Sequence, residues 1–223
     1  SVPTSPGCEN LNPLMCGLPY PSSRYLAADP DSATGYRLDL DPQAIPQNLA
    51  GDPFDVTPYE RLDGFSPATH IATLFDEPAD LSDAAFHDSI DASLDDDHPT
   101  VIIDRTTGER VAHWVENDAR ADSDEETLLY IRPAVSLRPN RGYIVAIRGV
   151  VDDQGTAIPA SPAFDVLRDL SDPTDERAPL YADILNRLDQ AGVPTDDLQQ
   201  AWDFTTASVD DVNGRLLTMR DEA

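Results

Sequence analysis

Hydrophobic and polar positions alternate with a period of two in short segments between residues 35 and 170, a pattern typical of half-buried β-strands. Turn sequences such as "DRTTGER", "RPNRG" and "DDQG" separate these segments. In the first of them, Gly108 is expected to turn a hairpin. Short strands divided by turns predict a mainly β protein with an Ig-like antiparallel β-sandwich at 35–207. The expected strands are 36–40, 71–75, 101–104, 111–115, 128–132, 143–151 and a last strand in "AWDFTTA" at 201–207.

The segment "APLYADILNRLDQAG" differs from the rest because its leucines and isoleucine recur every fourth position, with proline near the start and glycine after the end. This pattern predicts an amphipathic helix. A shorter turn is expected to begin at Thr195, whose side chain can cap free amides. The preceding strand is expected to end near Val166. The sequence therefore predicts a helical insertion at about 175–200, before the last strand.

One strand carries a more specific pattern. In "LRPNRGYIVAIRGVV", a leucine and a proline turn precede Tyr143, which opens the strand. This arrangement resembles a tyrosine corner, in which the phenol forms a hydrogen bond to upstream backbone. The alternative is that Tyr143 only fills the core. Alternation places two sets of residues on opposite faces: Tyr143, Val145, Ile147 and Gly149 on one, and Ile144, Ala146 and Arg148 on the other.

Residues 1–34 are rich in proline and poor in apolar runs, so an extended N-terminal arm is expected, tied down by a disulfide and by aromatic side chains. Cys8 and Cys16 are the only cysteines, and their short spacing favours a local disulfide. No histidine cluster stands beside them, so they are a weak metal signal. A disulfide suits an oxidising compartment, and we expect a secreted, cell-surface or periplasmic bacterial protein whose leader, if it was exported, has been removed.

The chain is strongly acidic, with 42 Asp and Glu residues against 15 basic residues and a formal charge of -27. Every basic residue is arginine. Such a charge repels nucleic acid and anionic membrane surfaces, so neither is an expected partner. No apolar run reaches the roughly 18 residues of a membrane-spanning helix. A solvated acidic surface is the ordinary interpretation, although carboxylates are also ligands for Ca²⁺.

The densest acidic loop, "ENDARADSDEE", is the candidate calcium site, with Glu116, Asp118, Asp122 and Asp124 as possible ligands. It lacks the residue order of an EF-hand. His113 precedes this loop in "HWVEND", and alternation puts it on the face of Val115, away from Glu116. No convergent acid–base pair follows, so solvated strand-end residues are expected there. The sequence contains no phosphate-binding loop or dinucleotide fingerprint, and no cofactor other than calcium is considered.

A serine nucleophile would need a strained elbow of the type G-x-S-x-G, and "GFSPA" comes nearest to it. The residue after Ser66 is Pro67, which lacks the backbone N–H that an oxyanion hole would use. Asp63, Ser66 and His70 lie within eight residues of one another, a spacing that seldom lets a triad converge. No catalytic residue is therefore expected in this chain.

The last residues, 208–223, begin with a variant capping box formed by Ser208 and Asp211. Apolar residues recur behind it at helical spacing, and this stripe needs a partner surface. The alternative is that the helix folds back onto the edge of the sandwich or frays as a tail. The residues of the stripe are Val209, Val212, Leu216 and Met219.

Four segments together resemble the N-terminal module of secreted bacterial α/β-hydrolases, in particular the bacterial virulence-factor lipase N-terminal domain. They are "DGFSPATHIATLF", "GERVAHWVEND", "LLYIRPAVSLRPNRGYIVAIRGVVDDQGTAI" and "AWDFTTASVDDVNGRLLTMRD", and the resemblance covers roughly residues 10–223. It implies an Ig-like sandwich in front of a lipase- or esterase-type catalytic domain, with "DGFS" as a structural signature. The terminal helix would then lead into that absent domain and contact it through Val212, Leu216 and Met219.

Two other functions compete with an accessory role. A freestanding binding module for a carbohydrate, surface or protein ligand would need exposed aromatic side chains, and Trp114 and Trp202 are the only tryptophans. A small hydrolase in its own right is disfavoured by the poor elbow at Ser66.

Overall fold

The computed structural model describes residues 8–41, 45, 47–52 and 54–223 and contains three antiparallel sheets within those residues. A two-stranded sheet pairs β1 with β2, and two three-stranded sheets have the orders β3-β6-β5 and β4-β7-β8. The strands are β1 (Leu26–Ala28), β2 (Tyr36–Leu38), β3 (Ile71–Leu74), β4 (Thr100–Asp104), β5 (His113–Asn117), β6 (Leu128–Pro133), β7 (Gly142–Arg148) and β8 (Leu198–Thr205).

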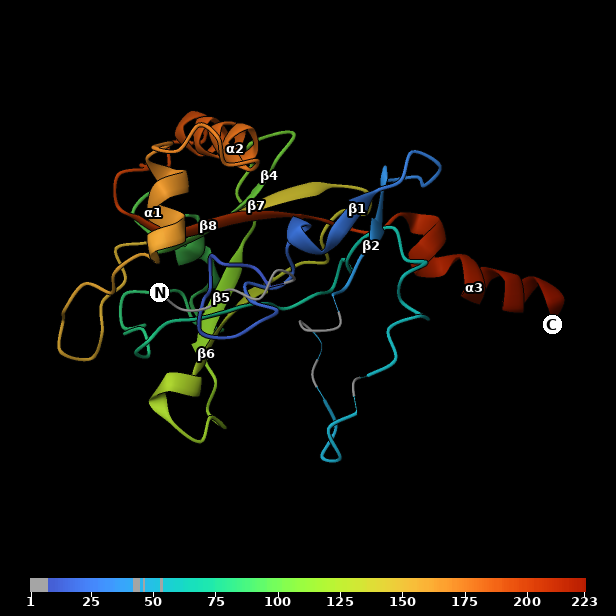
Figure 1. Ribbon diagram of the computed structural model, residues 1–223, viewed down its shortest axis with the longest axis horizontal. Helices are drawn as coiled ribbons and strands as arrows, with labels where there is room; N and C mark the ends of the chain where they lie inside the picture. Colours follow the sequence, from blue (N-terminus) through green and yellow to red (C-terminus); the bar gives the residue numbers. More distant parts are fainter. Residues whose placement is uncertain (1–7, 42–44, 46, 53) are drawn as a thin grey trace.

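Three α-helices lie outside the sheets, and they divide into a packed pair and a projecting one. The pair, α1 and α2, lies close to β8, whereas α3 extends away from the body of the protein (Figure 1). The described helices are α1 (Pro162–Arg168), α2 (Ala178–Gln190) and α3 (Val209–Glu222), with short 3₁₀ turns η1 (Ser23–Tyr25), η3 (Ile90–Leu94) and η4 (Asp124–Glu126).

The β4-β7-β8 sheet is buried on both faces, including the polar residues Gln199, Gln200 and Asp203 of β8. Register pairs Tyr143 with Phe204 and Val145 with Trp202, which confirms the predicted shared face. On that face the Trp202 Nε1–H donates to the Pro21 carbonyl in the arm, at 2.8 Å. The backbone of the sheet also anchors α2, since the Tyr181 hydroxyl donates to the Ala201 carbonyl. One hydrophobic core therefore joins both three-stranded sheets, the arm, α1 and α2.

The tyrosine corner is present. Tyr143 is buried, and its hydroxyl oxygen accepts a hydrogen bond from the Arg138 backbone N–H at 2.8 Å. Its ring stacks on Phe204, with 5.7 Å between ring centroids. The residue therefore does more than fill the core, because it also holds the turn before β7 against the sheet.

The predicted disulfide between Cys8 and Cys16 is confirmed. Tyr25 holds the arm to the core, as predicted for its aromatic side chains, and Leu11 joins it there. The described part of the arm also contains η1 and β1, which were not predicted. Backbone bonds in both directions between Tyr20 and Ala72 attach it beside β3. Residues 1–7 of the predicted arm lie outside the described residues.

The hairpin predicted at Gly108 is confirmed, but it is short. The Gly108 N–H donates to the Asp104 carbonyl, and Ile103 pairs antiparallel with Arg110. Beyond this pairing the chain continues as β5, which pairs with β6 in the other sheet. The predicted strand 143–151 ends at Arg148, because Gly149 adopts a φ of 62°, a left-handed conformation that breaks the strand.

The predicted helical insertion at about 175–200 is shifted. Residues 162–168, expected to end a strand, form α1, whose start is capped by the Ser161 hydroxyl accepting the Phe164 N–H. After α2, only a turn occurs at Thr195, and β8 begins at Leu198. The start of β8 was not predicted because Gln199 and Gln200 are polar, whereas the structure buries both side chains.

Candidate functional site

The "DGFS" segment holds the start of α3. The Asp63 carboxylate accepts a hydrogen bond from the Ser208 N–H at 2.9 Å, and the Asp63 N–H donates to the Asp211 carboxylate at 2.6 Å. Burial raises the pKa of the Asp211 carboxyl. The Ser208 hydroxyl accepts the Asp211 N–H, as the capping-box prediction requires. In a full capping box the Asp211 side chain would accept the Ser208 N–H in return, but here Asp63 accepts it. We call Asp63, Ser208 and Asp211 the α3 clamp.

Gly64 lets the two chain segments approach closely. A Cβ built on Gly64 would lie 2.7 Å from both the Ala207 nitrogen and the Thr206 carbonyl carbon, which are backbone atoms that cannot turn aside. The next residue, Phe65, is buried and exchanges two backbone hydrogen bonds with the chain that leaves β8. Only glycine fits between these segments, so a larger residue cannot replace Gly64 in "DGFS" without moving the backbone.

Thr206 connects the clamp to the tyrosine corner. Its hydroxyl donates to the Arg138 carbonyl at 2.7 Å and accepts the Arg141 N–H at 3.0 Å. The same Arg138 donates its N–H to Tyr143. The end of the last strand, the corner and the base of α3 therefore form one continuous hydrogen-bonded structure, so the direction in which α3 leaves the body is set by buried groups.

Beyond the clamp, α3 presents its apolar stripe to solvent. None of its residues is buried, and Val212, Leu216 and Met219 are 42%, 64% and 58% exposed. Figure 1 shows the helix pointing away from the sheets. The alternative in which it folds back onto the sheet edge is therefore not the arrangement observed. Contact with another domain through these three residues stays a prediction.

The residues considered for a serine triad are used in other ways. Asp63 belongs to the α3 clamp, and the Ser66 hydroxyl accepts the Ala68 N–H in a turn. His70 is exposed at the entrance to β3. Within the described residues, no hydrogen bond joins Ser66 to His70 or His70 to Asp63.

The acidic residues proposed for calcium do not converge. Glu116 forms an ion pair with Arg132 across the β5-β6 pair, and the Asp118 carboxylate accepts the Arg120 N–H. Asp122 and Asp124 are exposed. Over the described ranges, no group of three His, Cys, Asp or Glu side chains could hold a metal ion. Calcium binding there stays a prediction.

His113 is not a solvated strand-end residue, because it is completely buried beside His98. The two rings are 5.4 Å apart at 83°, and the Thr100 hydroxyl lies 2.8 Å from His113 Nε2. The His98 Nε2 accepts the Ala85 N–H at 2.8 Å, which requires a neutral ring. Burial lowers the pKa of His98 and lowers that of His113 to about 4. One indication of this burial was present in the sequence, because alternation placed His113 on the same strand face as the apolar Val115.

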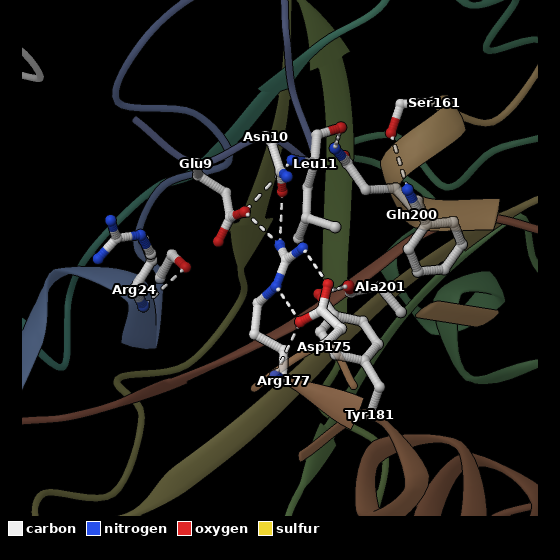
Figure 2. A network of polar contacts seen from close by, with 12 residues as sticks. Glu9, Asn10, Leu11, Arg24, Ser161, Asp175, Arg177, Tyr181, Gln200 and Ala201 are labelled. Carbon is white, nitrogen blue, oxygen red and sulfur yellow. Dashed lines mark hydrogen bonds and ion pairs between the residues drawn. The ribbon is translucent and has the colours of Figure 1, made fainter. Parts of the chain in front are cut away.

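A second polar cluster, which the sequence analysis missed, ties the arm to α2 (Figure 2). Arg177 forms a two-pronged pair with Asp175, and its third nitrogen contacts Glu9 at 3.2 Å and Asn10. Burial raises the pKa of Glu9, and the positive charge of Arg177 opposes that rise. All three guanidinium nitrogens of Arg177 have partners within the protein, so this cluster supports the arm.

Among the described residues, no helix has the length and apolar character needed to cross a membrane. No protein-family model matches the chain, and no curated protein matches it either.

Proposed function

We propose that this chain is a non-catalytic accessory domain with an Ig-like β-sandwich, which presents α3 to a lipase- or esterase-type α/β-hydrolase domain of the same secreted bacterial polypeptide. The observation that carries the proposal is the contrast between the two ends of α3. Its base is fixed by the α3 clamp and by buried Phe65, whereas its stripe is apolar and exposed. A helix built this way positions a neighbouring surface.

Three further features support this role. The tyrosine corner is a hallmark of Ig-like sandwiches, and here it is joined to the base of α3 through Thr206. Asp63, the carboxylate of the triad considered from the sequence, instead accepts a hydrogen bond from Ser208 at the start of α3. The disulfide between Cys8 and Cys16 is consistent with export to an oxidising compartment.

Two neighbouring leucines of α3 allow a matched test. Consecutive helix positions differ by about 100°, so Leu216 lies within the stripe and Leu217 lies outside it. The domain and the polypeptide encoded downstream of Ala223 would be produced separately, and their affinity measured by calorimetry. Leu216→Asp should weaken binding at least about tenfold, because a buried leucine contributes about 1.5–3 kcal/mol. Leu217→Asp should leave affinity within about twofold.

Two results would overturn the proposal. One is a stop codon directly after Ala223, or a downstream frame without G-x-S-x-G followed by Asp and His. The other is hydrolysis of p-nitrophenyl esters by the isolated domain that Ser66→Ala abolishes.

One observation favours the alternative of a freestanding extracellular binding module for a carbohydrate, surface or protein ligand. Trp202 is buried and offers no platform, but Tyr20, Phe54 and Tyr59 are exposed. If this role were the correct one, the domain would bind its ligand with full affinity when no second domain is present.

A further inference from the structure

A cavity of about 280 Å³ opens between the arm and the loop that follows β2. Its volume is at the lower end of pockets that hold small molecules. No charged side chain lines it within the described residues, and its wall is almost entirely apolar. The wall includes four aromatic and three aliphatic side chains: Tyr20, Tyr25, Phe54, Tyr59, Leu40, Ile45 and Val56.

The aromatic side chains of this cavity remain accessible. Phe54 is 57% exposed and Tyr59 43% exposed, and their rings lie 5.8 Å apart. Tyr20 forms the opposite part of the wall and is held by an edge-to-face contact with buried Phe65. Three of the five exposed aromatic side chains in the described residues therefore gather at one cavity. Scattered apolar side chains are ordinary on a protein surface, but such a cluster marks a binding surface.

Tyr25 contributes to the wall, but its hydroxyl is sealed from the cavity. The residue is 2% exposed, and its hydroxyl oxygen is inaccessible to solvent and lies near the backbone amides of Glu9 and Gly17. The backbone of Tyr25 is fixed by bonds to Ser22 and Asp39. Tyr25 therefore supplies a fixed part of the wall and no hydrogen-bonding group for a ligand.

The charge of the surroundings restricts the ligand. The chain carries a formal charge of -27, and acidic residues flank the two exposed rings in sequence at Asp52, Asp55 and Glu60. An anionic ligand would be repelled, and a cation would find no carboxylate in the described wall. We propose that this cavity binds a small, neutral, largely apolar molecule that packs against the rings of Tyr20, Phe54 and Tyr59. This site is independent of any second domain.

Two fluorescent probes with the same ring system test the proposal. N-Phenyl-1-naphthylamine is neutral and carries one N–H, whereas 8-anilinonaphthalene-1-sulfonate adds a negative charge. Titration of the intact chain should give saturable fluorescence with the neutral probe and at least about tenfold weaker binding of the anionic one. Equal binding of the two probes, or no saturable binding of the neutral one, would refute the proposed ligand class.

Substitutions then place the site. Phe54→Ala should lower the affinity for the neutral probe about tenfold, because it removes one aromatic wall. The matched control is Phe86→Ala, at a phenylalanine that is 45% exposed and lies outside the cavity, and it should change affinity less than twofold. An equal effect of Phe54→Ala and Phe86→Ala would show nonspecific adsorption and overturn the assignment.

Discussion

Removal of the Asp63 carboxylate should release the base of α3. In Asp63→Ala, the Ser208 N–H loses the one acceptor that it has among the described residues. Ser208 is 6% exposed, so water replaces that acceptor poorly. An unsatisfied buried donor costs about 1–3 kcal/mol, and we take about 2 kcal/mol as the expected loss. The Asp63 N–H can still donate to Asp211, so the loop itself should keep its place.

Hydrogen–deuterium exchange measures this loss where it occurs. A loss of about 2 kcal/mol corresponds to roughly 30-fold faster exchange of amides in the first turn of α3. Where the helix stays attached, the same loss appears as a fall in Tm of roughly 4–8 °C for a chain of this size. Asp63→Asn is the matched control, since its carbonyl oxygen can still accept the Ser208 N–H. Unchanged exchange in the alanine variant, or equal acceleration in both variants, would refute the clamp.

Three other substitutions and conditions test neighbouring parts of the structure. Gly64→Ala should destabilise the domain by about 1–3 kcal/mol in urea denaturation, because its Cβ meets the Ala207 backbone; a neutral result would contradict that close approach. Tyr143→Phe should lose about 1 kcal/mol by leaving the Arg138 N–H unpaired, and an unchanged denaturation midpoint would remove the corner. Because the pKa of His113 is lowered to about 4 in the folded state, protonation of this residue favours unfolding. The free energy of unfolding should therefore be highest above about pH 6.5 and should fall by about 3 kcal/mol as the pH drops to 4. His113→Gln should flatten that part of the pH–stability curve, and an unaltered slope would show that other groups cause it.

Local patterns predicted most of the elements. The helix α2, the disulfide and the shared face of Tyr143 and Val145 follow from spacing within a few residues, and each is confirmed. The missed helix α1 also had a local signal, since Ser161 and Pro162 form a capped helix start. The helix was missed because "SPAFDVLR" was interpreted as the end of a strand.

Contacts between distant residues could not be predicted in this way. Asp63 and Ser208 are 145 positions apart, and Glu9 and Arg177 are 168 apart. Gln200 illustrates the same limit, because its polar side chain favoured a turn while the fold buries it against Thr73. A polar residue in one sequence does not reveal whether a distant partner will satisfy it.

The contacts of "DGFS" give its residues a structural role. The Asp63 carboxylate accepts the Ser208 N–H, and Phe65 exchanges two backbone hydrogen bonds with the chain that leaves β8. Gly64 lies so close to that chain that a Cβ would not fit.

The most direct test of the accessory role is amide exchange along α3 in two molecules, the 223-residue domain and the longer polypeptide with its downstream segment. The account predicts that amides near Leu216 exchange quickly in the domain alone, where this side chain is exposed, and at least about tenfold more slowly in the longer polypeptide. Equally fast exchange in both molecules would contradict it, because the apolar stripe would then have no partner to meet.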